Sequence, residues 1–165
     1  MASESFDITT GCDLQEVDNA VNQALREITG RFDFKNVLVE VEFDRAKATI
    51  GIHTADQYKL DASWDVLLGR LIARKVPVKN LKRGEPQPAA SSTVRQEISL
   101  VQAIDGDTAR RIAKFVRDLK LKKVQAQVQG DAVRISGPSR DDLQATMQGL
   151  RAEDWGVELT FGNYR

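Results

Sequence analysis

The same order of hydrophobic patterns occurs twice along the chain. Each occurrence runs strand, helix, strand, strand, helix, strand, because apolar residues are spaced by two in some segments and by three or four in others. Each half therefore predicts a four-stranded antiparallel sheet with two helices on one face, the ferredoxin-like arrangement. We expect an α+β protein built from two such domains in tandem.

The first half contains the clearest helix start. Asp13 can cap the first turn, and Glu16 follows three residues later, as in a capping box. Apolar residues then recur at helical spacing, which predicts a helix over residues 13–29. The other elements expected in this half are strands at 5–10, 37–43, 48–52 and 78–82, and a second helix around 60–71.

The second half follows a segment, 84–93, that contains two prolines and mostly small residues without an apolar period. We expect this segment to be a linker, which gives a first domain at residues 1–88 and a second at 89–165. Asp107 and Ser139 are expected to cap the two helices of the second domain. Its strands are expected at 94–101, 124–129, 132–136 and 157–161.

Composition limits the classes of protein to consider. The chain has 24 Lys and Arg residues and 24 Asp and Glu residues, so its formal net charge is zero and a strong whole-protein field for nucleic acid is not expected. No apolar run approaches the roughly 20 residues of a membrane helix, and the N-terminus does not resemble a secretory signal. The single cysteine, Cys12, cannot form an internal disulfide. We expect a cytoplasmic protein without membrane association.

An unusual polar face is predicted for the hairpin in the second half. Alternation directs the apolar residues of 124–129 and 132–136 toward the helices, so Gln125, Gln127, Gln129 and Arg134 lie on the opposite face. A glutamine amide offers a donor and an acceptor side by side, and a guanidinium can bind a guanine edge or a phosphate with two hydrogen bonds. Gln125, Gln127 and Arg134 are candidates for nucleotide binding. The alternative is that they are ordinary exposed strand residues.

Charge is distributed unevenly along the chain. Residues 1–35 hold seven acidic and three basic residues, whereas residues 110–123 hold seven basic residues and one acidic residue. We therefore expect an anionic ligand to prefer the second half. Arg110, Lys114 and Arg117 are spaced to form one stripe on a helix face, so they are further candidates, although such a stripe is also typical of a solvated helix surface.

Several site types are not supported by the sequence. The expected central strands carry no aromatic pair for stacking bases, and no glycine-rich phosphate-binding loop occurs. No Ser or Cys is paired with the single histidine, His53, as a nucleophile, and no spacing singles out an acid–base pair of carboxylates. No residue set matches a metal site, and no cofactor is indicated. The sequence therefore favours a binding protein over an enzyme.

Several segments, taken in order along nearly the whole chain, resemble the YajQ family of bacterial proteins. They are SFDI, DLQEVDNAVNQALREITGRFDFKN, RLIARKVPVKNL, KLKKVQAQVQGDAVRISGPSRDDLQ and ELTFGNYR. The resemblance implies two ferredoxin-like, RNP-like domains that exchange their first strands. On that basis residues 5–10 would join the second sheet, and residues 94–101 the first.

The resemblance also implies a function. The family is regarded as nucleotide-binding, and members act as cyclic di-GMP effectors that can engage transcription regulators. It supplies no defined set of contact residues, so the site remains a physical hypothesis. Arg31 and Asp33, where a helix ends and a strand begins, are added as candidates, with a local ion pair as the equally favoured alternative.

The leading hypothesis is a non-enzymatic protein that binds cyclic di-GMP or another purine nucleotide and so regulates a partner. Two alternatives stay open. One is a module that associates with RNA or tRNA through shape and backbone contacts, which predicts strong salt dependence. The other is a protein-interaction scaffold that uses the open faces of its sheets.

Overall fold

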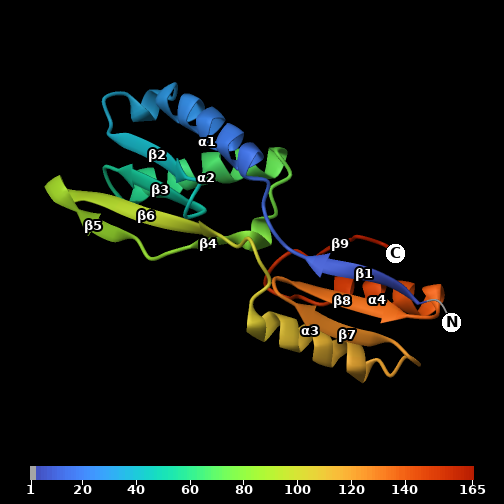
Figure 1. Ribbon diagram of the computed structural model, residues 1–165. Helices are drawn as coiled ribbons and strands as arrows, with labels where there is room; N and C mark the ends of the chain where they lie inside the picture. Colours follow the sequence, from blue (N-terminus) through green and yellow to red (C-terminus); the bar gives the residue numbers. More distant parts are fainter. Residues whose placement is uncertain (1–2) are drawn as a thin grey trace. The chain divides into compact units, whose positions relative to one another are not determined.

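The computed structural model describes residues 3–165 and divides the chain into two compact units. One unit comprises Gly11–Gln102, and the other combines the residues up to Thr10 with Ala103–Arg165. The unit Gly11–Gln102 is the first unit, and the other is the second (Figure 1). Each has its own buried core, and the two cores share no residue.

The first unit has an antiparallel sheet in the order β2-β3-β6-β4, with the short strand β5 also paired to β6. Its helices α1 and α2 lie on one side of that sheet (Figure 1). The elements are α1 (Leu14–Thr29), β2 (Val39–Asp44), β3 (Thr49–Thr54), α2 (Gln57–Ala73), β4 (Leu81–Arg83), β5 (Gln87–Ala89) and β6 (Thr93–Leu100).

Helix α1 begins as its sequence predicts. Asp13 is the N-cap, and its Oδ1 accepts hydrogen bonds from the backbone N–H groups of Gln15 and Glu16 at 3.0 and 3.3 Å. The apolar stripe of α1 packs with that of α2 over the inward side chains of the sheet, such as Ile50 and Ile98, which are fully buried. Amphipathic spacing therefore determines which face of each element is buried.

The second unit has a four-stranded antiparallel sheet in the order β7-β8-β1-β9. Its strand β1 comes from the start of the chain and lies between β8 and β9, whereas β6, the strand after the 84–93 segment, lies in the first sheet. The first strands of the two units thus pair in each other's sheets. The elements are β1 (Glu4–Thr9), α3 (Gly106–Asp118), β7 (Gln125–Gln129), β8 (Ala132–Gly137), α4 (Arg140–Ala152) and β9 (Thr160–Gly162).

Three local predictions need correction. The segment 84–93 is not a free linker, because β5 pairs with β6 and the N–H of Gly84 donates to the carbonyl of Glu97 at 2.8 Å. Helix α3 is capped by Asp105, whose carboxylate accepts from the N–H of Thr108 at 2.7 Å, while Asp107 lies in the first turn. The last strand is shorter than predicted and starts at Thr160, later than the predicted residue 157.

Candidate functional site

The outer face of the second sheet carries the polar residues predicted for it, but its arginine is already paired. The register places Gln127, Arg134 and Asp7 in one row across β7, β8 and β1. Arg134 donates from Nε and Nη2 to the Asp7 carboxylate at 2.9 and 3.4 Å, and Asn163 donates to it at 2.6 Å. These hydrogen bonds lower the pKa of Asp7 and raise that of Arg134. A phosphate would have to compete with this ion pair.

The basic stripe of α3 lies on a different surface from that row. Helix α3 buries Ala109, Ile112 and Val116 against the inner side of the sheet. At about 100° per residue, Arg110, Lys114 and Arg117 lie on the opposite side of the helix, and all three are exposed. Arg110 also forms an ion pair with Asp107. The structure therefore does not bring the α3 cations together with Arg134, Gln125 and Gln127.

Arg31 and Asp33 form a local ion pair in the first unit. Arg31 donates two hydrogen bonds to the Asp33 carboxylate, at 3.0 and 2.8 Å, and these raise the pKa of Arg31 and lower that of Asp33. The Lys59 ammonium lies 5.0 Å from the centre of the Phe34 ring, beside this pair. The eight residues predicted as candidates thus form three separate groups.

A groove in the second unit combines apolar, aromatic and cationic surfaces. It has a volume of about 430 Å³, which lies within the range of about 300–1,000 Å³ typical of ligand pockets. The start of β1, the first turns of α4 and the segment after β9 form its walls. The residues that line it are Glu4, Ser5, Arg140, Leu143, Gln144, Met147, Tyr164 and Arg165.

The backbone and the core hold these residues in position. The N–H of Arg165 donates to the carbonyl of Ser5 at 3.0 Å, and the N–H of Ser5 donates back at 3.0 Å. Leu143 and Met147 point from α4 into the core and leave only their edges at the groove. Tyr164 is 62% exposed, with its ring centre 6.4 Å from that of Phe6. Its exposed ring can therefore stack on a planar ligand.

Two arginines supply the cationic part of the groove lining. Arg140 donates from Nε and Nη2 to the Glu4 carboxylate at 3.1 and 3.0 Å, which lowers the pKa of Glu4 and raises that of Arg140. The Arg140 side chain remains 77% exposed, so its third nitrogen and its outer edge face solvent. The charge of Arg165 helps to lower the pKa of Asp7, a carboxylate on the outer face of the same sheet. Two arginines and one glutamate thus line the groove, and the exposed edge of Arg140 can bind an anion.

A second hollow lies on the outer face of the first sheet and has the opposite charge. It has a volume of about 320 Å³, and its carboxylates come from Glu40, Glu42, Glu85 and Glu97. Its histidine, His53, contacts Glu40 through Nδ1 at 2.9 Å and the Thr93 hydroxyl through Nε2 at 2.8 Å. Arg95 is the single arginine that lines it. This surface would repel phosphate groups.

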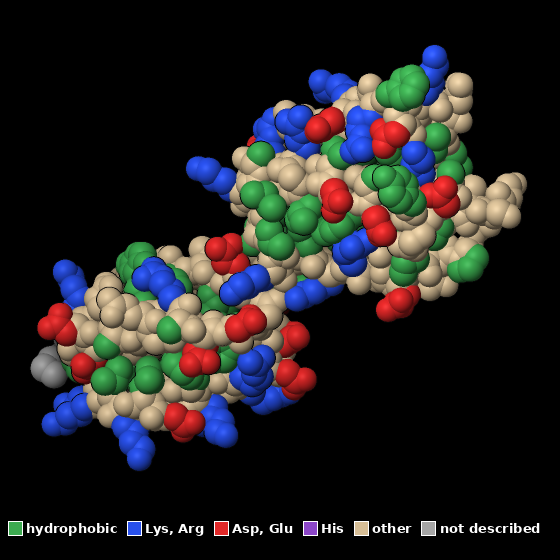
Figure 2. All heavy atoms as spheres, turned by 180° about the vertical axis from the view of Figure 1, so that it is seen from behind, with side chains coloured by type: hydrophobic (Ala, Val, Ile, Leu, Met, Phe, Trp, Pro, Cys, Tyr) green, Lys and Arg blue, Asp and Glu red, His purple; other side chains and the backbone are tan. Residues whose placement is uncertain are grey.

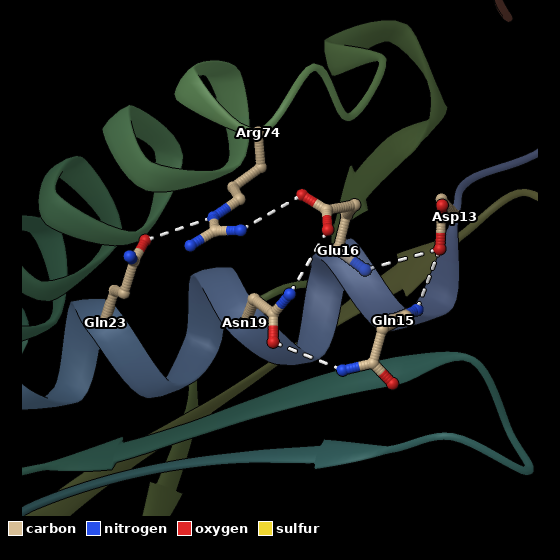
Figure 3. Close-up of polar contacts among 6 residues, drawn as sticks. All are labelled: Asp13, Gln15, Glu16, Asn19, Gln23 and Arg74. Atoms are coloured by element: carbon tan, nitrogen blue, oxygen red, sulfur yellow. Dashed lines mark hydrogen bonds and ion pairs between the residues drawn. The ribbon is translucent and has the colours of Figure 1, made fainter.

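Two other arginines, Arg70 and Arg74, connect the helices of the first unit. Arg74 donates to Gln23 and to Glu16, both at 3.3 Å, and so connects α2 to α1 (Figure 3). Arg70 donates to Glu27 on α1 at 2.8 Å.

Basic and acidic side chains are interspersed on the face seen in Figure 2. Within residues 3–165, no group of three or more His, Cys, Asp and Glu side chains is arranged to hold a metal ion.

Comparison with known proteins gives the family. The family described as "Nucleotide-binding protein YajQ-like" matches residues 4–165. The chain belongs to the YajQ-like family. It is 45% identical over 165 residues to a protein of Koribacter versatilis, covering 100% of this chain and 99% of the relative, and 46% identical over 166 residues to one of Bacillus cytotoxicus, covering all of both. A Syntrophotalea carbinolica protein is 47% identical over 161 residues, 98% of each chain. All three relatives are named nucleotide-binding proteins.

Sequence reasoning missed the groove of this YajQ-like chain. Arg140 directly follows the predicted cap Ser139, and Tyr164 and Arg165 end the segment ELTFGNYR, but none of the three is a predicted site residue. The consecutive residues Tyr164 and Arg165, which follow the last strand, could have indicated a site. The implied position of residues 5–10 in the second sheet could have indicated what lies beside them. In the part of the chain that the structure describes, no helix is long and apolar enough to span a membrane.

Proposed function

We propose that this YajQ-like chain is a non-enzymatic nucleotide-binding protein whose ligand is cyclic di-GMP, and that the groove beside α4 holds the ligand. The observation that carries the proposal is the combination, in one groove of about 430 Å³, of an exposed tyrosine ring, apolar edges and two arginines. A nucleotide presents the matching parts, namely a planar base and negative phosphates. The names of the relatives support the ligand class.

Each side chain has a defined role in this proposal. A guanine base stacks on Tyr164 and covers the edges of Leu143 and Met147, while the amide of Gln144 reads the polar edge of the base. Arg140 and Arg165 neutralise phosphate groups, each with up to two parallel hydrogen bonds. Cyclic di-GMP carries two phosphates, which matches two guanidinium groups. The relatives are named for binding a nucleotide, which supports binding as the proposed role of these side chains.

The ligand acts by changing which conformations of the protein are populated. A nucleotide that binds one arrangement of the β1 start and the 164–165 segment more tightly stabilises that arrangement. A partner protein, proposed to be a transcription regulator, then recognises the altered surface. The site spans both ends of the chain, so ligand binding also stabilises the exchanged strand β1 in the second sheet.

Calorimetry with cyclic di-GMP, GTP and ATP tests this proposal. We expect cyclic di-GMP to bind most tightly, and Arg140→Gln to weaken it roughly ten- to a hundredfold, since hydrogen bonds to charged groups contribute about 1.5–3 kcal/mol. Tyr164→Ala should weaken binding through the loss of stacking. Arg117→Gln is the matched control, because Arg117 is an exposed arginine of the same unit outside the groove.

The results of these titrations distinguish a wrong function from a wrong binding site. Absence of heat with all three nucleotides at high micromolar concentration would remove the function. If Arg140→Gln binds like the wild type while Arg134→Ala loses affinity, the function stands and the site moves to the outer face of the second sheet, where Gln125 and Gln127 also lie.

RNA is the alternative ligand that the basic stripe of α3 favours, since Arg110, Lys114 and Arg117 face solvent together. RNA binding by such a stripe releases counterions, so its affinity falls steeply as salt is added. Cyclic di-GMP binding with two phosphate contacts should show a shallow dependence. Titration of a short RNA and of cyclic di-GMP at several salt concentrations distinguishes the two.

A further inference from the structure

Strand β7 forms one edge of the second sheet, and its alternation of polar and apolar residues is symmetric about its centre. It pairs with β8 on one side and with no other strand of residues 3–165. Its five residues read Gln-Ala-Gln-Val-Gln, with Gln127 in the middle. We propose that β7 pairs antiparallel with β7 of a second copy of this chain, so that the two sheets join into one.

The other edges of the two sheets carry features that discourage such pairing. Strand β2 presents Glu40, Glu42 and Asp44 on its outer face, and β9 has only three residues. The edge formed by β4 and β5 is interrupted at Gly84 and contains Pro86 and Pro88. Charges, prolines, bulges and short length are the usual protections of an exposed edge. Strand β7 contains neither a charge nor a proline, so its unpaired edge can accept another strand.

A twofold axis through Gln127 gives the register. Gln127 then faces Gln127 of the second copy, Gln125 faces Gln129, and Ala126 faces Val128. The three glutamine pairs all lie on the outer face, where each amide can donate to and accept from the amide opposite. Gln129 already donates to Gln127 at 3.3 Å within one strand, so a row of amides exists before pairing.

The inner face of β7 gives an independent reason for pairing. Val128 is 47% exposed, although alternation directs it to the side of the sheet that the helices cover. In the proposed register, Ala126 of the second copy lies directly opposite Val128. Pairing thus covers an apolar side chain that the fold of one copy leaves open.

Charges at the ends of β7 select the antiparallel direction. Lys122 and Lys123 precede the strand, and Asp131 follows it in the turn to β8. Antiparallel pairing brings the lysines of one copy toward Asp131 of the other, whereas parallel pairing would bring lysines together. A five-residue strand gives a small interface, so the dimer should be weak and its population should depend on concentration.

Sedimentation velocity over a range of protein concentrations, combined with a charge exchange at residue 127, tests this proposal. We expect the wild type to pass from monomer to dimer as concentration rises. Gln127→Lys and Gln127→Glu should each be monomeric, because the twofold axis places like charges directly opposite each other. An equimolar mixture of the two variants should form a dimer again, since Lys then faces Glu.

Circular dichroism checks that each variant is folded. Thr160→Lys, an exposed position on β9 at the other edge of the same sheet, is the control and should dimerise like the wild type. A wild type that is monomeric at all concentrations overturns the proposal. A dimer that persists in both single variants also overturns it, because another surface must then form the contact.

Discussion

At the scale of single residues, the structure shows that partners decide whether a charged side chain is available to a ligand. Arg134 was predicted correctly to face outward with the glutamines, because alternation fixes the face of a strand residue. Its ion pair with Asp7 joins residues 127 positions apart, and no local pattern reveals such a partner. Arg140 is paired as well, yet it lies in a groove beside an aromatic ring.

The Asp7–Arg134 pair should stabilise the second unit in a pH-dependent way. The folded-state pKa of Asp7 is lowered, so its contribution is fully present above its ordinary pKa of about 3.9 and is lost as pH falls through the depressed value. Asp7→Asn should lower the free energy of unfolding of this unit by about 1 to 2 kcal/mol at pH 7, and by progressively less in strong acid. Urea unfolding followed by Trp155 fluorescence, with Trp64→Phe in both proteins, measures this difference.

The control is Asp65→Asn, an exposed aspartate on α2 of the first unit, which should leave the Trp155 transition unchanged at every pH. A cost of Asp7→Asn that stays the same from pH 7 to strong acid would show that the ionised pair does not stabilise this unit.

The thiol of Cys12 should be unreactive in the folded protein. Burial raises its pKa to about 11, and the thiolate is the reactive form. At pH 8 we expect alkylation by iodoacetamide to be roughly a hundredfold slower in the folded chain than in urea, given this difference in thiolate population. Mass spectrometry over time measures both rates. Equal rates would mean that the start of α1 opens readily.

At the scale of elements, helices and hairpins could be predicted because their signals are local. The Asp13 cap, the apolar stripes of α1 and α2 and the alternation in 124–136 all lie within short windows of the sequence. Strand β5 could not be predicted, because Pro86 and Pro88 are typical of a linker and its pairing with β6 depends on the sheet already present. The exchange of β1 and β6 came from the family resemblance, since spacing does not specify strand partners.

The strand exchange predicts which unit each strand stabilises. Phe6 and Ile8 of β1 are buried in the core of the second unit, and Ile98 of β6 is buried in the core of the first. Ile8→Ala should therefore lower the free energy of unfolding of the second unit by about 2–5 kcal/mol. It should also increase hydrogen exchange in β7 and β8. Ile98→Ala, the matched variant, should increase exchange in β2 and β3. The reverse pattern would contradict the exchange.

At the scale of the whole molecule, the candidate site depends on distant parts of the chain. The groove combines residues 4 and 5, the first turns of α4 and residues 164 and 165, which meet only because β1 is inserted into the second sheet. No window of the sequence contains this set, so periodicity could place its elements but not the site. The family membership suggests the class of ligand that we propose, and the geometry of the groove suggests where it binds.

A map of backbone amide chemical shifts during titration with cyclic di-GMP would show whether the ligand binds in the groove. We expect saturable shifts centred on Ser5, Arg140, Gln144 and Tyr164, and none of comparable size in the acidic hollow around Glu42 and Glu97. The same titration of Arg140→Gln should require much more ligand. Saturable shifts that leave the groove unaffected and centre on another surface would contradict the account.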